Sequence, residues 1–224
     1  MGIASGDFGA EEIEIVNPQS YLINEIFYSV QGEGVQSGVP MVFIRFSKCN
    51  MQCAIEPGEK SPGGFDCDTE FESGTRMTLD EIGEAIEETF TDVPKKPCWL
   101  LLTGGEPGLQ ADEQFVEYFR ARDWQIAIET NGSVALKGYY DWICVSPKVA
   151  EHAIKQMTAD EVKYVRGYGQ GIPEPKCKAI FKVISPAFNG FEVDPAALRW
   201  CVKLVLVNPS WRLSVQSHKD WNVR

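Results

Sequence analysis

Cysteine thiols carry the clearest chemical potential in this sequence. Three of the seven cysteines, Cys49, Cys53 and Cys67, are close together in the chain. Thiolates are soft ligands that suit iron–sulfur clusters or zinc. A structural zinc site needs four ligands, and the two histidines, His152 and His218, are remote in sequence. Three clustered cysteines without an evident fourth ligand indicate a [4Fe–4S] cluster with one open iron, which could bind a substrate or cofactor.

Two other interpretations of the cluster cysteines stay open on the residues alone. They could be ordinary buried thiols, because cysteine is among the most buried residue types. Zinc is a further alternative. The remaining cysteines fit the structural interpretation, since two lie in apolar strand-like segments, one in a helix-like segment and one in a loop: Cys98, Cys144, Cys177 and Cys201.

Short polar motifs follow several apolar segments of the chain. They are QGEG at 31–34, TGGEP at 103–107, ETNG at 129–132, SPK at 146–148 and QSHK at 216–219. Paired glycines let the backbone approach a ligand closely and leave its polar groups free to bind. QGEG alone is also typical of a turn, whereas a strand that ends in TGGEP is more specific.

Two single residues stand out beside these motifs. Arg45 interrupts an apolar segment, and a buried guanidinium needs a partner such as a carboxylate. That partner could be a ligand or a protein residue in a structural salt bridge. His218 lies six residues from the end of the sequence, where a strand could hold it near the ligand-binding edge. A lone surface histidine is the alternative.

The elements that must position these residues alternate along the chain. Segments rich in β-branched and aromatic residues predict strands at 23–30, 41–46, 98–102, 125–129, 142–145, 161–165, 179–184 and 211–215. Helices are predicted from the capping box Thr78/Glu81 to about residue 90, over 109–122, and from Asp194-Pro195 to Val207. This alternation predicts an α/β domain with a mostly parallel sheet, whose chemistry gathers at the carboxyl ends of the strands.

Composition excludes several classes of protein. A net charge of −11 and no cluster of basic residues argue against nucleic acid and anionic membranes as partners. No apolar run is long enough for a membrane span, and residues 1–19 resemble a flexible tail rather than a secretory signal. An odd number of cysteines without such a signal favours reduced thiols, so we expect a cytoplasmic protein. Residues 20–224 then form a single domain, with loops at 54–66 and 166–177.

Seven motifs in order give the chain a family resemblance. They are INEIFYSVQGEG, VFIRFSKCNMQC, CDTEF, TGGEPGLQ, ETNG, CVSPK and WRLSVQSHK, from about Tyr21 to Arg224. Together they resemble the 7-carboxy-7-deazaguanine synthase family of the radical S-adenosylmethionine superfamily. The resemblance implies an abbreviated, partly open (β/α) barrel, because the predicted helices are fewer than a full barrel needs.

The resemblance also implies a role for each matching position. The cluster would be held by Cys49, Cys53 and Cys67, and Mg²⁺ by Thr69. Contacts to S-adenosylmethionine would come from Asp66, Cys67, Asp68, Gly105, Ser146, Pro147 and Lys148. Contacts to a pterin substrate would come from Val30, Gln31, Gly32, Glu33, Arg45, Thr103, His218 and the terminal carboxylate of Arg224.

The implied activity is that of a carbon–nitrogen lyase. It contracts the ring of 6-carboxy-5,6,7,8-tetrahydropterin to give 7-carboxy-7-deazaguanine and ammonia, in 7-deazapurine (queuosine) biosynthesis. Its cofactors would be a [4Fe–4S] cluster, S-adenosylmethionine and Mg²⁺, with the cofactors carrying the hard chemistry. A homodimer and an electron donor such as flavodoxin or ferredoxin are implied as well.

The cluster motif departs from the usual spacing of the superfamily, Cys-x3-Cys-x2-Cys. Thirteen residues separate Cys53 from Cys67 here, so 54–66 is interpreted as an insertion that folds away at little entropic cost. Two other functions are weighed against the synthase. A glycyl-radical activating enzyme would leave QGEG, Arg45 and QSHK without a role. A non-catalytic iron–sulfur or zinc module would need a fourth protein ligand.

Overall fold

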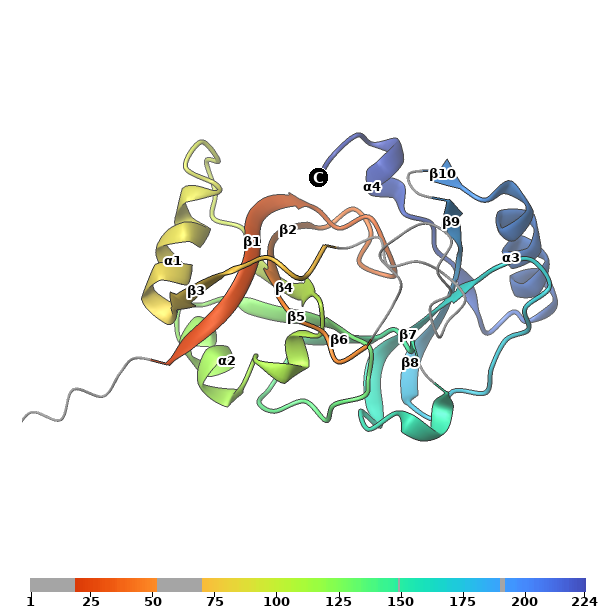
Figure 1. Ribbon diagram of the computed structural model, residues 1–224. Coiled ribbons are helices and arrows are strands. Elements are labelled where there is room, and N and C mark those ends of the chain that lie inside the picture. The colour runs from red at the N-terminus through yellow and green to blue at the C-terminus, as the bar shows by residue number, and fades with distance from the viewer. Residues whose placement is uncertain (1–18, 52–69, 149, 190–191) are drawn as a thin grey trace, which may run out of the picture.

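The computed structural model describes residues 19–51, 70–148, 150–189 and 192–224 (Figure 1). The tail predicted at 1–19 lies outside the described residues up to residue 18, and β1 begins at Ser20. The insertion predicted at 54–66 also lies outside them. No helix in the described part of the chain is long and apolar enough to cross a lipid bilayer.

Most strands of the described residues form one sheet, in the order β11-β8-β7-β6-β5-β4-β2-β1-β3. Their bounds are β1 (Ser20–Val30), β2 (Pro40–Phe46), β3 (Thr75–Thr78), β4 (Trp99–Gly104), β5 (Gln125–Thr130), β6 (Trp142–Val145), β7 (Thr158–Arg166), β8 (Lys178–Pro186) and β11 (Arg212–Leu213). β9 (Phe188–Asn189) and β10 (Glu192–Val193) form a separate antiparallel pair.

Strand directions follow the prediction except at one edge. Every pairing from β2 to β11 is parallel, as expected for apolar strands joined by crossover connections. β1, however, runs antiparallel to both β2 and β3. Because β1 is reversed, its last residue, Val30, pairs with the first residue of β2, Pro40. The QGEG motif follows the first strand, as predicted, but because β1 is antiparallel to β2 the motif begins beside the first residue of β2 rather than beside the last.

Helices begin where the sequence supplies capping side chains. They are α1 (Leu79–Glu88), α2 (Glu113–Arg120), α3 (Pro195–Val207) and α4 (Ser217–Asp220), with 3₁₀ turns η1 (Pro107–Leu109) and η2 (Glu151–Ala153). The capping box of Thr78 and Glu81 is confirmed at α1, and Asp194 caps α3. The helix predicted over 109–122 starts later, because Asp112 accepts a hydrogen bond from the amide of Phe115 and so caps α2 there.

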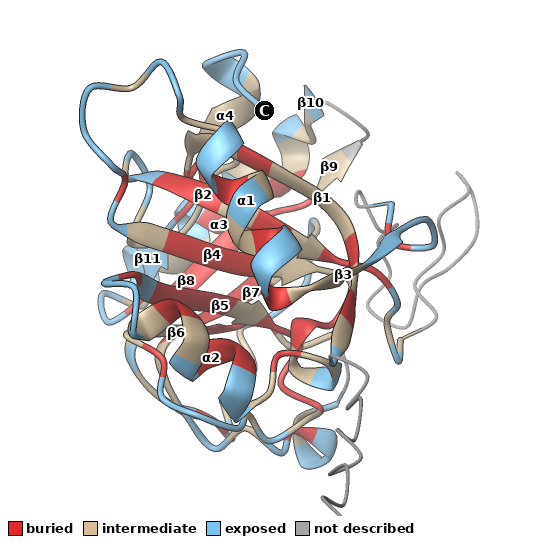
Figure 2. Ribbon diagram, turned by 90° about the vertical axis from the view of Figure 1, so that its left-hand side faces the viewer, coloured by how far each residue is buried: buried red, intermediate tan, exposed pale blue. Residues whose placement is uncertain are grey.

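Alternating side chains give the sheet two different faces. On one face Leu102 and Ile128 belong to a large apolar core that α1 and α2 cover. Figure 2 shows these helices in front of the buried strands β2, β4 and β5, with their outer sides exposed. Thr103 and Glu129, each one residue further along, point to the opposite face. The polar candidates of β4 and β5 thus lie on the face without these helices.

The sheet is open, as the resemblance predicts. In the described ranges β3 and β11 form its two edges, and no α-helix separates β5 from β6, β6 from β7 or β7 from β8. The chain after β11 crosses back toward β1, where the hydroxyl of Ser29 donates a 2.7 Å hydrogen bond to the backbone oxygen of Arg224. In Figure 1 this C-terminal segment with α4 lies above β1 and β2.

Candidate active site

Three loops meet at the carboxyl edge of the sheet, around Cys49. The amide of Glu106 donates to the backbone oxygen of Lys48 at 3.0 Å. A Cβ atom at Gly105 would lie 2.1 Å from that same oxygen, so only glycine allows this approach. Asn131 donates to the side chain of Asn50 at 3.1 Å. The motifs TGGEP and ETNG are therefore brought to the cysteine loop, as their positions after β4 and β5 predict.

Glu106 fastens the loops after β4 and β5 to each other. Its carboxylate is fully buried and accepts hydrogen bonds from the Thr130 hydroxyl (2.7 Å), the Asn131 amide (2.7 Å) and the Gly108 amide (2.9 Å). Burial raises the pKa of Glu106, although these three hydrogen bonds oppose that shift. Glu106 was part of a predicted motif, but its role as a link between two loops was not predicted.

Cys49 lies where nitrogen donors face its sulfur. The Met51 amide is 3.4 Å from Sγ, and the side-chain nitrogen of Asn131 is 4.0 Å from it. Donors around a sulfur suit a thiolate that holds a cluster, because hydrogen bonds to cluster sulfurs tune its potential. Lys48, just before Cys49, has a left-handed φ of 71°, which is uncommon for a residue other than glycine and marks a constrained loop.

The other predicted cluster and magnesium ligands lie in one stretch of the chain. Cys53, Cys67 and Thr69, with Asp66 and Asp68, lie outside the described residues. Among the residues that are described, no three histidine, cysteine or acidic side chains group closely enough to hold a metal. The four cysteines interpreted as structural are free thiols, and three of them are buried while Cys98 is exposed.

The SPK run lies beside the same loops. The amide of Ser146 donates to the backbone oxygen of Thr130 at 2.8 Å, which places β6 next to the ETNG turn. The Lys148 amine donates to the Ser146 hydroxyl at 3.2 Å. Pro147 lies between them. Gly105 and the SPK run, both predicted to contact S-adenosylmethionine, thus lie at the ends of nearby strands.

A second group forms where the loop after β1 meets β5 and the C-terminal segment. Gln31 donates to Glu129 at 3.1 Å, and Gln216 donates to Glu33 at 2.7 Å. The amide of Ser217 donates to the backbone oxygen of Gly32 at 2.9 Å. This loop therefore reaches the ligand-facing side of the sheet through its contacts, even though β1 runs in the reverse direction.

His218 lies directly against this loop. A Cβ atom at Gly32 would come within 2.3 Å of the His218 ring nitrogen Nδ1, so the glycine is required for close packing. The histidine is held by α4 rather than by a strand, because β11 has only two residues and ends before the QSHK motif. The structure brings Gly32 and His218 together, and both were predicted to contact substrate.

Two strands carry both groups. Thr103 on β4 donates to Glu129 at 3.4 Å, and Gly105, two residues further on and just past the end of β4, contacts the cysteine loop. Glu129 on β5 belongs to the Gln31 group, and Asn131, just past the end of β5, contacts the cysteine loop. Two residues of a strand span roughly 7 Å. The cysteine loop and the Gln31 group are thus neighbours near the carboxyl ends of β4 and β5.

Sequence reasoning predicted Glu33 but missed the lysine that pairs with it. Lys163 on β7 is buried and pairs with Glu33 and, at 3.4 Å, with Glu129. Burial of Glu33 favours a raised pKa, but the charge and hydrogen bond of Lys163 and the hydrogen bond from Gln216 lower it to about 2. A sequence signal was present, since the charges of EVKYV alternate with apolar residues within a predicted strand.

Arg45 has a protein partner. Its guanidinium lies 2.9 Å from the Glu25 carboxylate, and Arg224 pairs with the same carboxylate. The structural salt bridge that the sequence left open is therefore present. Arg224 also lies over the ring of Phe27, which ties the end of the chain to β1.

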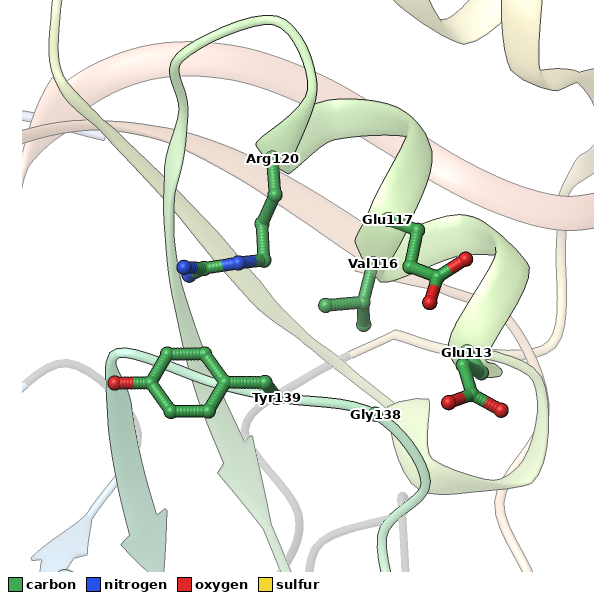
Figure 3. Close-up of a pocket in the computed structure, with 6 residues that line it drawn as sticks. All are labelled: Glu113, Val116, Glu117, Arg120, Gly138 and Tyr139. Carbon is green, nitrogen blue, oxygen red and sulfur yellow. The ribbon is translucent and has the colours of Figure 1, made fainter.

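A surface pocket along α2 lies apart from both groups. It is lined by Glu113, Val116, Glu117, Arg120, Gly138 and Tyr139 (Figure 3). Arg120 stacks over Tyr139 and pairs with Asp141, so its charge is already balanced. This pocket contains none of the predicted site residues.

Comparison with known proteins decides the family. The chain is 39% identical over 207 residues to the 7-carboxy-7-deazaguanine synthase of Bacteroides thetaiotaomicron, covering 90% of this chain and 98% of that protein. It is 37% identical over 208 residues to the synthase of Caulobacter vibrioides, covering 89% and 97% respectively. This chain belongs to the 7-carboxy-7-deazaguanine synthase family. The family predicted from the seven motifs is confirmed.

A solved structure supports the fold. The crystal structure of QueE from Escherichia coli matches with a TM-score of 0.61 at 21% identity, over 88% of this chain and 94% of that one. The partly open α/β barrel predicted from sequence is thereby confirmed. No family model matches the chain.

Proposed function

We propose that this chain contracts the ring of 6-carboxy-5,6,7,8-tetrahydropterin to 7-carboxy-7-deazaguanine and releases ammonia, a step of 7-deazapurine (queuosine) biosynthesis. Relatives of that name align over about nine tenths of the chain. The observation that carries the proposal in the structure is the adjacency on β4 and β5, where the cysteine loop and the Gln31 group share two strand ends. A radical made at the first group would meet a substrate held by the second.

The cysteine loop would hold the cluster through Cys49, Cys53 and Cys67. When bound, a reduced [4Fe–4S] cluster supplies the electron that cleaves S-adenosylmethionine to methionine and a 5′-deoxyadenosyl radical. The protein would hold that cofactor through Asp66, Cys67, Asp68, Gly105, Ser146, Pro147 and Lys148. The backbone around Gly105 suits this task because it is held in one position: the Gly105 amide donates to the Phe46 oxygen at 2.9 Å, and the Glu106 amide donates to the Lys48 oxygen at 3.0 Å. Mg²⁺ held by Thr69 would act as a Lewis acid.

The pterin would lie against Val30, Gln31, Gly32, Glu33, Thr103 and His218. The low pKa of Glu33, set by Lys163 and Gln216 against the effect of burial, keeps its carboxylate an acceptor at neutral pH. An ionised carboxylate suits the N–H groups on the aminopyrimidine edge of a pterin. Arg45 would bind the carboxylate on C6, and the terminal carboxylate of Arg224 would complete the site.

The reaction begins with loss of the hydrogen at C6. Holding C6 at the boundary between the two groups places it near the radical source and away from water. Arg45 fixes the substituent on C6, and Glu33 fixes the far edge of the ring. With both ends held, the ring can rearrange and lose nitrogen without leaving the site.

The proposal also covers the enzyme's location, oligomeric state and electron donor. We expect a cytoplasmic homodimer that receives electrons from a flavodoxin or ferredoxin. The odd cysteine count and the acidic net charge of −11 support reduced thiols and a small-molecule substrate rather than nucleic acid.

Anaerobic reconstitution tests the function. The chain is loaded with iron and sulfide, then incubated with dithionite, S-adenosylmethionine and the carboxypterin, and the products are analysed by mass spectrometry. We expect 7-carboxy-7-deazaguanine and 5′-deoxyadenosine. Formation of 5′-deoxyadenosine without the deazaguanine would overturn the substrate, and an intact cluster that forms neither would overturn the radical chemistry as well.

A further inference from the structure

Lys163 lies between two carboxylates that come from different parts of the chain. Glu33 belongs to the loop after β1, and Glu129 lies near the end of β5. The side chain of Lys163 is only 6% exposed, and its amine contacts both carboxylates. A buried lysine is costly unless it is paired, so this amine depends on its partners as much as they depend on it.

The surrounding side chains fix each carboxylate separately. Gln31 donates to the same Glu129 oxygen that Lys163 contacts, and Gln216 holds the other oxygen of Glu33. Glu161 lies two residues before Lys163 on β7. Its carboxylate accepts a 2.8 Å hydrogen bond from the Val35 amide and so also binds the loop after β1. β7 therefore holds the QGEG loop at two points.

Ionisable side chains from five parts of the fold surround Lys163 and its two partners. They are Glu33 from the loop after β1, Glu129 from β5, Cys144 from β6, Glu161 from β7 and His218 from α4. Burial raises the pKa of the Cys144 thiol and of the Glu161 carboxyl. Among these groups, Glu33 and Glu129 are the two whose side chains form ion pairs with Lys163.

We propose that Lys163 is a positioning residue that keeps Glu33 and Glu129 ionised together and at a fixed separation, so that the pterin site presents acceptors to the substrate. This inference rests on the proposed function for its substrate, but its electrostatic part does not. Sequence motifs give Lys163 no role, because the residue lies in the middle of a strand outside all seven motifs.

Removing the charge has a consequence that a purely structural lysine would not have. Two carboxylates that share a buried site without a cation cannot both ionise readily, so one of them gains a raised pKa. Below that pKa one carboxyl carries a proton and offers a donor where the pterin N–H groups need an acceptor. Substrate affinity should then fall as the pH falls, whereas the wild-type site keeps its acceptors.

The test compares uncharged and charged replacements in the cluster-loaded protein with S-adenosylmethionine and no reductant. Binding of the carboxypterin is measured by calorimetry for wild type, Lys163→Met, Lys163→Gln and Lys163→Arg. The matched control is Lys178→Met, since Lys178 is exposed on the neighbouring strand β8. Two uncharged variants are used because one of them could fail to fold.

For Lys163→Met or Lys163→Gln we expect a loss of affinity relative to wild type of at least about 10-fold near pH 6, narrowing to about 3-fold near pH 8.5. For Lys163→Arg, the affinity relative to wild type should not change with pH, because arginine keeps the positive charge. Lys178→Met should match wild type. A loss that is equal at all pH values, or no loss at all, would overturn the inference while leaving the function intact.

A second measurement needs no substrate. Infrared titration of the same variants follows the carbonyl stretch of a protonated carboxyl, which should appear at a higher pH in the uncharged variants than in wild type. Absence of that band difference would overturn the inference by itself. Failure of wild type to bind the carboxypterin would instead contradict the proposed function, and the infrared result would still decide the role of Lys163.

Discussion

Arg45 and Glu25 face each other on adjacent antiparallel strands, with guanidinium and carboxylate 2.9 Å apart. Arg224 shares the same carboxylate, so two cations surround one anion. Two guanidinium groups carry more positive charge than the one Glu25 carboxylate balances, so a second carboxylate can bind to them. The substrate carboxylate proposed for Arg45 would supply it, and the salt bridge would then orient Arg45 rather than occupy it.

Replacing Arg45 separates these roles. We expect Arg45→Ala to weaken carboxypterin binding by about 10- to 100-fold, as for the loss of a charge-assisted hydrogen bond, while cluster content stays unchanged. Affinity is measured by titration calorimetry and the cluster by iron analysis. Glu25→Gln serves as the control, because it removes the salt bridge but leaves Arg45 its charge. Equal affinity losses in both variants would show that Arg45 acts only through the salt bridge.

Gly32 tests the contact with the C-terminal segment. In Gly32→Ala the added methyl would lie 2.3 Å from the His218 ring and 2.5 Å from its amide nitrogen, so α4 must move away. We expect KM for the pterin to rise by about 10-fold or more, because a small displacement at a binding site is costly. Proteolysis near the C-terminus should also become faster.

Gly171 provides the matched control for that substitution. A Cβ atom at Gly171 meets nothing within 4 Å, so Gly171→Ala should leave KM and proteolysis unchanged. If Gly32→Ala behaves like Gly171→Ala in both measurements, the packing of His218 on the loop has no part in substrate binding.

Glu33 links the site to acid stability. Although burial opposes it, pairing with Lys163 lowers the pKa of Glu33 from 4.5 to about 2. A carboxyl with a lowered folded-state pKa stabilises the fold above its unfolded pKa, and that contribution disappears as the pH falls from about 4.5 toward 2. The contribution is roughly 3 kcal/mol. Denaturant unfolding of the cluster-free chain should therefore show Glu33→Gln less stable than wild type at pH values above about 5, and the two converging in acid. A constant difference at every pH would contradict this.

Glu106 is expected to matter through its hydrogen bonds. In Glu106→Gln the amide nitrogen replaces one acceptor oxygen, which leaves a buried N–H group of the β4–β5 linkage without its partner. We expect a loss of roughly 2–3 kcal/mol in unfolding free energy, measured in urea, together with lower iron content after reconstitution. Glu117→Gln on the exposed side of α2 should change neither. If the urea midpoint of Glu106→Gln equals that of wild type, the hydrogen bonds of Glu106 do not stabilise the link between the loops after β4 and β5.

Local signals predicted the parts of the fold that depend on local physics. Thr78 and Glu81 predict the start of α1, and Asp194 with Pro195 predicts the start of α3. Both could be read from sequence because helix capping uses residues within one turn of each other. Gly105 was predictable for a similar reason, since TGGEP follows its strand directly. These features need no knowledge of which strands pair.

The remaining features depend on contacts between distant segments. The reversal of β1 decides that Glu25 lies opposite Arg45, and no local pattern around Arg45 indicates it. Lys163 meets Glu33 across 130 residues of sequence. The alternation around Lys163 shows that its side chain shares a face with Glu161, but the identity of its partners requires the fold. Pairings between segments far apart in the sequence could therefore not be predicted without the fold.

Transfer of the C6 hydrogen tests the central claim most directly. The carboxypterin is prepared with deuterium at C6 and incubated anaerobically with the reconstituted protein, reductant and S-adenosylmethionine, and the 5′-deoxyadenosine formed is analysed by mass spectrometry. We predict one deuterium in that product, together with 7-carboxy-7-deazaguanine. Unlabelled 5′-deoxyadenosine alongside unchanged carboxypterin would contradict the account, because the radical would then form without meeting the substrate.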